Sequence, residues 1–259
     1  MVPTLAAMAE VYGLSRDGGP QSPRFTRYVE LGRSGVPVSG YNPMTSQDAL
    51  GTVTALRAID AESLVLEAAS ESLSRLGLPP SVNLELSVTV ATPGMWTDRL
   101  ATEIEHRLTG RTPTQVLFWT GEDVTLFAVR REAVAQTVRA ALSVLHGPAE
   151  TAALAAGQEG LACALADVLA PAARTDAEHS AVAEALGVMG SDTTLATKAA
   201  LLYGDAAAEA MGWTPLGIPP HAGYRHATAR AHAALASTPA ATLAKSRWTP
   251  STRGIHESG

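Results

Sequence analysis

The stretch VNLELSVTVA, residues 82 to 91, alternates apolar and polar side chains without a break. Because successive side chains of a strand point to opposite faces of its sheet, this pattern predicts a strand that buries one face only. Strands that helices cover on both faces read instead as continuous apolar runs. The alternation therefore argues against a central strand of a doubly wound parallel sheet, the commonest fold that binds nucleotide cofactors.

Two shorter apolar runs follow, at residues 115 to 120 and 124 to 129, and only Gly121, Glu122 and Asp123 separate them. A connection this short closes an antiparallel hairpin and cannot carry the crossover that parallel strands need. We therefore expect a small mixed or antiparallel sheet of three strands.

Helical periodicity covers most of the remaining chain. Leu100, Ile104 and Leu108 recur at four-residue spacing, and Gly110 is placed to end that helix. Similar patterns predict helices over residues 5 to 12, 131 to 146, 176 to 186, 191 to 211 and 222 to 236. The predicted fold class is α+β or mixed α/β, dominated by helices, with the sheet in the middle third and a helical carboxyl-terminal half.

Composition divides the chain into four segments. Residues 1 to 44 are rich in Gly and Pro and predict an irregular arm or lid. Residues 45 to 147 form the predicted α/β core with its three-stranded sheet, and residues 148 to 236 form a helical region packed on that core. Residues 237 to 259 read as a polar tail of the kind that is often flexible.

The net charge and the cysteine content limit the binding partners and the compartment that we expect for this chain. The formal net charge is −6, so nothing in the composition favours nucleic acid or an anionic membrane surface. The single cysteine, Cys163, cannot form an internal disulfide, and we expect a cytoplasmic protein. No apolar run is long enough to predict a membrane span.

No motif in the sequence identifies a cofactor. It contains no GxxxxGKS/T, no HExxH and no GxSxG motif, and no GxGxxG motif follows a predicted strand. Glu103 and His106 form only half of a di-iron pattern, and their surroundings read as a solvated helix face, so we predict no metal ligand set.

The densest polar cluster lies near the carboxyl end, and its members are His221, Tyr224, Arg225, His226, Arg230 and His232. The three histidines cannot converge on one metal ion from a single straight helix, because each residue turns the helix by about 100°. His226 and Arg230 do share a face, which suits a carboxylate or phosphate group. Since histidine titrates near neutral pH, His226 is the predicted acid or base.

Tyr203, Gly204 and Asp205 interrupt an otherwise apolar helical run. If the last helices pack together, the tyrosine hydroxyl and the carboxylate would orient His226. The alternative is that Gly204 allows close helix packing and Asp205 faces water.

Two segments of the predicted arm carry groups suited to binding. Arg16 precedes an Asp-Gly-Gly-Pro turn whose backbone N–H groups could hold an anion, and Tyr41 and Asn42 form a second constrained polar segment. Long irregular arms often act as lids over a site.

The leading hypothesis is a cytoplasmic enzyme that acts on a small polar or anionic metabolite by acid/base chemistry, as a lyase, isomerase or hydrolase without a nucleotide cofactor. The predicted catalytic residues are His226, Tyr203 and Asp205. The predicted substrate-binding residues are Arg16, Tyr41, Asn42, Tyr224, Arg225 and Arg230. Two alternatives stay open: a non-catalytic scaffold or regulatory subunit that pairs through apolar helices, and a metal- or haem-binding oxidative enzyme with His106, His226 or Tyr203 as ligand. A homo-oligomer is compatible with each.

Overall fold

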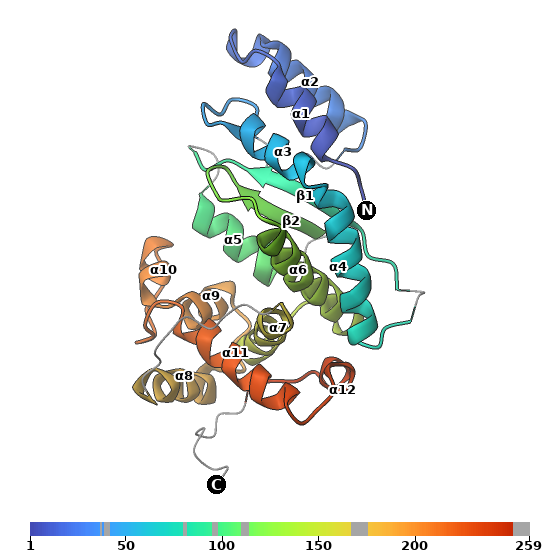
Figure 1. Cartoon of the computed structure of the whole chain (residues 1–259). Helices are drawn as coiled ribbons and strands as arrows, with labels where there is room; N and C mark the ends of the chain where they lie inside the picture. The colour runs from blue at the N-terminus through green and yellow to red at the C-terminus, as the bar shows by residue number, and fades with distance from the viewer. Residues whose placement is uncertain are drawn as a thin grey trace. The chain divides into compact units, whose positions relative to one another are not determined.

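The structure is a computed structural model that describes residues 1–36, 38, 42–79, 82–94, 98–109, 114–166 and 176–250. Helices dominate it, and a small sheet lies in the middle third of the chain, as predicted (Figure 1). Along the chain the elements are α1 (Leu5–Gly13), η1 (Gly19–Gln21), α2 (Pro23–Arg33), α3 (Ala49–Ala58), α4 (Ala61–Arg75), β1 (Leu86–Ala91), α5 (Arg99–Leu108), β2 (Thr114–Trp119), α6 (Leu126–His146), α7 (Ala152–Leu165), α8 (Asp176–Met189), α9 (Leu195–Tyr203), α10 (Asp205–Ala210), α11 (Ala222–Leu235) and α12 (Ala240–Lys245).

The chain divides into two compact units, neither of which is continuous in sequence. Unit 1 comprises Met1–Glu71, Asn83–Thr102 and Arg111–Thr137. Unit 2 comprises Ser72–Val82, Glu103–Gly110 and Val138–Gly259. The four consecutive segments expected from composition therefore do not coincide with these units.

The sheet that the structure describes, in unit 1, has two parallel strands, so the expected mixed or antiparallel sheet of three strands is wrong. β1 and β2 lie side by side with Leu86 opposite Thr114 and Ala91 opposite Trp119 (Figure 1). The chain between them includes α5, and a crossover with a helix is the usual way to join parallel strands. The run expected as a third strand, residues 124 to 129, instead leads into α6, which begins at Leu126.

β1 is also shorter and more buried than its alternation indicates. All six of its residues are buried, including Ser87 and Thr89, which the pattern placed on a solvated face. Small hydroxyl side chains fit a covered sheet face at lower cost than long or charged ones, so alternation of this kind did not report solvent exposure. The expectation of a strand buried on one face only is wrong.

Unit 1 has its core between the sheet and helices. One face of the sheet contributes Val88, Val90, Val116 and Phe118, which pack with apolar residues of α1, α3, α4 and the first part of α6. The first residues of the chain extend the sheet, since the N–H of Val2 donates to the oxygen of Leu86 at 2.8 Å. The segment expected as an irregular arm holds α1 and α2, and Ser22 caps α2 by accepting a hydrogen bond from the N–H of Phe25.

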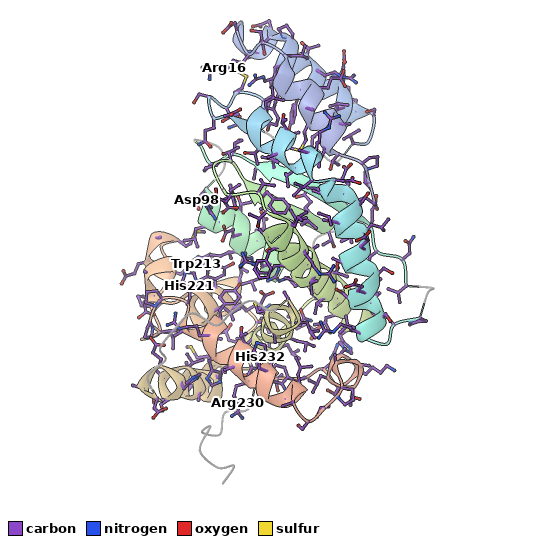
Figure 2. All side chains as sticks on the ribbon, viewed as in Figure 1. Arg16, Asp98, Trp213, His221, Arg230 and His232 are labelled. Carbon is purple, nitrogen blue, oxygen red and sulfur yellow. The ribbon has the colours of Figure 1, made fainter. Side chains whose placement is uncertain are left out.

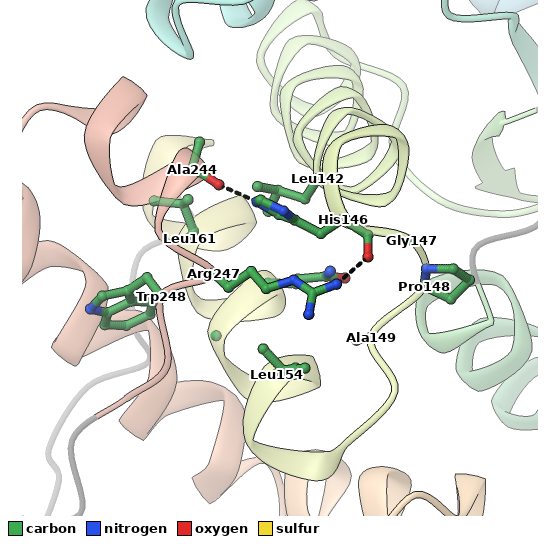
Figure 3. Close-up of a pocket in the computed structure, with 12 residues that line it drawn as sticks. Leu142, His146, Gly147, Pro148, Ala149, Leu154, Leu161, Ala244, Arg247 and Trp248 are labelled. Carbon is green, nitrogen blue, oxygen red and sulfur yellow. Dashed lines mark hydrogen bonds between the residues drawn. The ribbon is translucent and has the colours of Figure 1, made fainter.

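Unit 2 is built on the contact between α7 and α11, with α8 and α9 beside them. The helices approach closely because Gly160 of α7 faces the backbone of α11, where a Cβ atom would lie 2.5 Å from the oxygen of Ala227. The chain beyond α11 also packs on this unit: His146 Nε2 lies 2.5 Å from the oxygen of Ala244, and Arg247 donates to the oxygen of His146 at 2.6 Å (Figure 3). Residues 237 to 250 are thus held in place.

Among the described residues, no helix is both long enough and apolar enough to cross a membrane.

Candidate functional site

The end of α9 and the start of α11 are in backbone contact. Gly223 faces the backbone of α9 so closely that a Cβ atom would overlap the oxygen of Leu201. Gly204 has a φ of 88°, and a Cβ atom there would lie 2.5 Å from the oxygen of Pro219. Both positions therefore require glycine, and the Tyr-Gly-Asp break marks a close approach of two segments.

Three aromatic side chains meet at this junction. The rings of Tyr203 and Tyr224 pack edge to face with their centroids 5.0 Å apart. The ring of His221 lies 5.9 Å from that of Tyr203 and 6.5 Å from that of Tyr224. His221 is exposed, whereas Tyr203 is only 2% exposed, so the cluster runs from the surface into the interior of unit 2.

The two tyrosine hydroxyl groups are buried. Apart from their interaction with each other, neither has a hydrogen-bond partner in the part of the chain that the structure describes. Burial raises the pKa of Tyr203, while Arg107 and the Tyr224 hydroxyl act in the opposite direction. Burial likewise raises the pKa of Tyr224 well above its ordinary value, so both phenols are protonated hydrogen-bond donors at neutral pH.

His221 carries two features typical of functional residues. It precedes α11 with a φ of 56°, in the left-handed region that is strained for residues other than glycine. Burial lowers the pKa of His221, and the charges of Arg225 and Arg107 lower it further, against an opposing effect of Glu103. The imidazole is therefore neutral at pH 7 and able to accept a proton.

A buried ion pair lies near the same junction. Arg139 of α6 binds Glu159 of α7 through two hydrogen bonds of 2.8 Å, with side-chain exposures of 8% and 2%. The charges of both residues affect the pKa of Tyr224, where Glu159 raises it and Arg139 lowers it. The tyrosines thus border a polar region inside unit 2.

His226 lies in a separate cluster, where α11 meets α8. It is 2% exposed, and its Nδ1 atom lies 3.0 Å from Nδ1 of His179, so one imidazole donates to the other. Beside this pair, Arg225 forms a 3.0 Å ion pair with Glu178 and donates to the oxygen of Pro220 at 2.8 Å. The predicted acid or base therefore has an imidazole partner that sequence reasoning did not identify.

The side chain of Asp205 is hydrogen-bonded to backbone N–H groups. Its carboxylate accepts hydrogen bonds from the N–H groups of Leu216, Gly217 and Ile218, at 2.8, 3.0 and 3.1 Å. These contacts hold the loop before α11, and they give Asp205 an indirect part in positioning the junction. Asp205 therefore does not simply face water, as the alternative expectation had it.

The remaining predicted residues that the structure describes are not part of this junction. Arg230 is partly exposed farther along α11, where Figure 2 labels it near His232. Arg16 and Asn42 belong to unit 1, and Tyr41 lies outside the described residues. The predicted substrate-binding set is thus divided between the two units.

Arg16 borders an open cleft of about 510 Å³ in unit 1. Arg24 lines the same cleft, but it donates to the backbone oxygens of Leu14 and Tyr12 at 2.9 and 3.0 Å. Asn42 donates its backbone N–H to the Tyr12 hydroxyl at 3.2 Å, and burial raises the pKa of Tyr12 to about 12. These contacts order the cleft walls and leave Arg16 as its exposed cation (Figure 2).

Two further cavities lie in unit 2. One is an open cleft of about 460 Å³ bordered by Lys198, whose amine donates to the oxygen of Ala149 at 2.6 Å. The other has room for about 20 Å³ between the end of α6, α7 and the chain around Arg247 (Figure 3). The first is large enough for a small molecule, and the second for little more than a water molecule.

No group of three or more His, Cys, Asp or Glu side chains among the described residues is arranged to hold a metal ion. The residues that the metal or haem hypothesis names, His106, His226 and Tyr203, lie on three different helices of unit 2.

The chain matches no protein-family model, no curated protein and no solved structure with which it was compared. Its function is therefore inferred from the site itself.

Sequence reasoning named His221 but gave it no role, and it passed over His179, Arg139 and Glu159. A signal for the buried ion pair is present, because Glu159 is the only charged residue in α7. A charge in so apolar a helix is costly unless it is paired. His179 carries no comparable signal, since its partner is 47 residues away.

Proposed function

We propose that this chain is an enzyme that acts on a small polar or anionic metabolite by acid/base chemistry at the junction of α9 and α11. The observation that supports this best is the contact of an exposed, neutral imidazole, His221, with two tyrosine rings whose hydroxyl groups are buried. A base that solvent can reach and donors shielded from solvent are the components that proton transfer at a substrate requires.

In this proposal His221 is the general base. Its lowered pKa keeps it unprotonated at neutral pH, and its position at the surface lets a substrate approach. The positive charge of Arg107, which helps to lower that pKa, also favours a substrate with negative charge, whereas that of Arg225 is balanced by its ion pair with Glu178. His221 thus replaces His226 as the first choice for the catalytic base.

His226 keeps a secondary place. Its hydrogen bond to His179 would carry a proton between a buried imidazole and a partly exposed one. Tyr224 and His226 are two residues apart on α11, and side chains at that spacing point to nearly opposite sides of a helix. We therefore assign His226 to positioning or proton supply, and proton abstraction from substrate to His221.

A lyase, an isomerase or a hydrolase would suit this arrangement. The single cysteine favours a reducing compartment, and we place the reaction in the cytoplasm.

The experiment is a comparison of metabolite consumption. The purified chain is incubated with a defined mixture of small carboxylic acids and phosphate esters, and the mixture is followed by proton NMR. We expect at least one compound to disappear with the wild type and with H232Q, in which an exposed histidine of the same helix is changed.

The decisive variant is H221N, since asparagine tolerates the left-handed backbone that His221 adopts. It should consume that compound at least about a hundredfold more slowly, the size of a typical general-base effect. Consumption of no compound by the wild type, or equal rates in H221N and the wild type, would contradict the proposal.

A further inference from the structure

We infer that the hydroxyl groups of Tyr203 and Tyr224 together bind a carbonyl oxygen of the substrate, and that the reaction begins with loss of a proton from the carbon beside that carbonyl group. This inference rests on the proposed function and adds the substrate class.

The first argument is the state of the two hydroxyl groups. Both oxygen atoms are shielded from solvent, and apart from each other's hydroxyl group neither has a hydrogen-bond partner among the described residues. Buried polar groups in native proteins nearly always have their donors satisfied, and a single bond between two hydroxyl groups leaves one O–H without an acceptor, which points to a molecule that supplies it. Both phenols are protonated at neutral pH, so the missing partner is an acceptor.

The second argument is geometry. The edge-to-face contact of the rings, with centroids 5.0 Å apart, holds the two side chains in one orientation relative to each other. Tyr203 ends α9 and Tyr224 lies in the first turn of α11, so the contact of the two helices fixes both residues. Donors fixed before the substrate arrives need no reorganisation when charge develops on the oxygen.

The third argument is electrostatic. Arg107 and Arg139 act on Tyr224 as positive charges against a larger opposing effect of Glu159, whose carboxylate Arg139 binds. A carbonyl oxygen that gains negative charge at this position meets two O–H donors in an environment that excludes water. Such interactions are stronger there than in solvent.

The chemical step balances as written. His221 takes a proton from the carbon beside the carbonyl group, and the electron pair of the broken C–H bond forms a C=C bond. The electron pair of the C=O double bond moves to the oxygen, which becomes an enolate oxygen that accepts hydrogen bonds from Tyr203 and Tyr224. Return of a proton to the same or another carbon regenerates neutral His221, so no oxidant or reductant is needed.

The test uses oxalate, a stable planar anion that resembles the enolate of a 2-oxo acid. The full chain is labelled with 3-fluorotyrosine and titrated with oxalate while its fluorine NMR spectrum is recorded, with each signal assigned by a Tyr→Phe variant. We expect saturable shifts in the signals of Tyr203 and Tyr224 and none in that of Tyr28, which belongs to unit 1.

The matched variants are Y203F, Y224F and Y28F. Phenylalanine keeps the ring and removes only the hydroxyl group, so Y203F and Y224F should each weaken oxalate binding by at least about tenfold, while Y28F leaves it unchanged. Absence of a saturable shift, or undiminished affinity in both Y203F and Y224F, would overturn the inference.

Thermal unfolding separates a binding role from a structural one. Because the two hydroxyl groups have only each other as a hydrogen-bond partner among the described residues, Y203F and Y224F should melt close to the wild-type temperature. A clear fall in both melting temperatures would assign the hydroxyl groups to the fold and overturn the inference.

The inference and the proposed function fail in different ways. Metabolite consumption that depends on His221, without oxalate binding at the tyrosines, removes the inference and leaves the function. Oxalate binding at the tyrosines without any consumption removes the function and leaves an oxygen-binding site.

Discussion

The N–H group of His221 donates a 2.9 Å hydrogen bond to the oxygen of Tyr203, and it thereby joins the start of α11 to the end of α9. The same two residues are in ring contact. A backbone hydrogen bond and a ring contact therefore both hold His221 next to Tyr203. The candidate base thus lies beside a residue whose hydroxyl group is buried. The predictions below test the packing that makes this arrangement and the chemistry expected of it.

Glycine at position 223 should be required for the junction. In G223A the new methyl group overlaps the oxygen of Leu201, so we expect a loss of at least about 3 kcal/mol in the free energy of unfolding. The matched control is G187A in α8, where no atom lies within 4 Å of the added Cβ. That change should stabilise the protein by about 0.5–1 kcal/mol. Urea unfolding measures both, and equal stabilities would contradict the close contact of α9 and α11.

Removing one partner of the buried ion pair of Arg139 and Glu159 should lower the free energy of unfolding far more than replacing both partners with apolar residues. E159A leaves a guanidinium group in the interior without its carboxylate, and we expect it to lower the free energy of unfolding by about 3–5 kcal/mol. The double variant R139M/E159L replaces both charges with apolar groups and should recover most of that loss. A double variant no more stable than E159A would show that the two residues do not act as a pair.

Asp205 should matter for stability. Its carboxylate accepts three backbone hydrogen bonds from the loop before α11, and D205A should cost about 2 kcal/mol. E209A changes an exposed carboxylate on the same short helix, α10, and should cost nothing measurable. If D205A unfolds at the same urea concentration as E209A, the loop is not held as described.

The lowered pKa of His221 predicts a pH-dependent stability. The folded protein binds this proton less readily than the unfolded chain, whose histidine titrates near its ordinary pKa of 6.5. Stability from this residue is therefore complete above pH 6.5 and is lost as the pH falls toward the lower pKa of the folded state. H221N should show a smaller loss over this range than the wild type in thermal unfolding, and identical profiles would be evidence against the lowered pKa.

Helices were the part of the fold most open to prediction. Apolar residues at four-residue spacing and a terminating glycine predicted α5, and the helix expected over residues 222 to 236 matches α11, which spans Ala222–Leu235. The sheet was not predictable in the same way, because Ser87 and Thr89 read as solvent-facing and are fully buried. Alternation reports polarity along a strand, whereas burial depends on which elements cover it.

The candidate site was open to prediction only in part. The glycine at position 204 and the polar residues of α11 pointed to a close approach, and the structure brings Tyr203 and Tyr224 into contact. The pairings of His226 with His179 and of Arg139 with Glu159 join different helices, so they depend on tertiary packing that local patterns do not encode. Local sequence therefore indicated which helix carries the candidate site, but not which of its side chains meet there.

The most direct test of the account is an NMR titration of the His221 imidazole in the wild type and in R225Q. Burial and the charges of Arg225 and Arg107 should give His221 a pKa below 6.5, and loss of the Arg225 charge should move it upward. A pKa at or above 6.5 in the wild type, unchanged in R225Q, would contradict the claim that a neutral imidazole stands beside the two tyrosines.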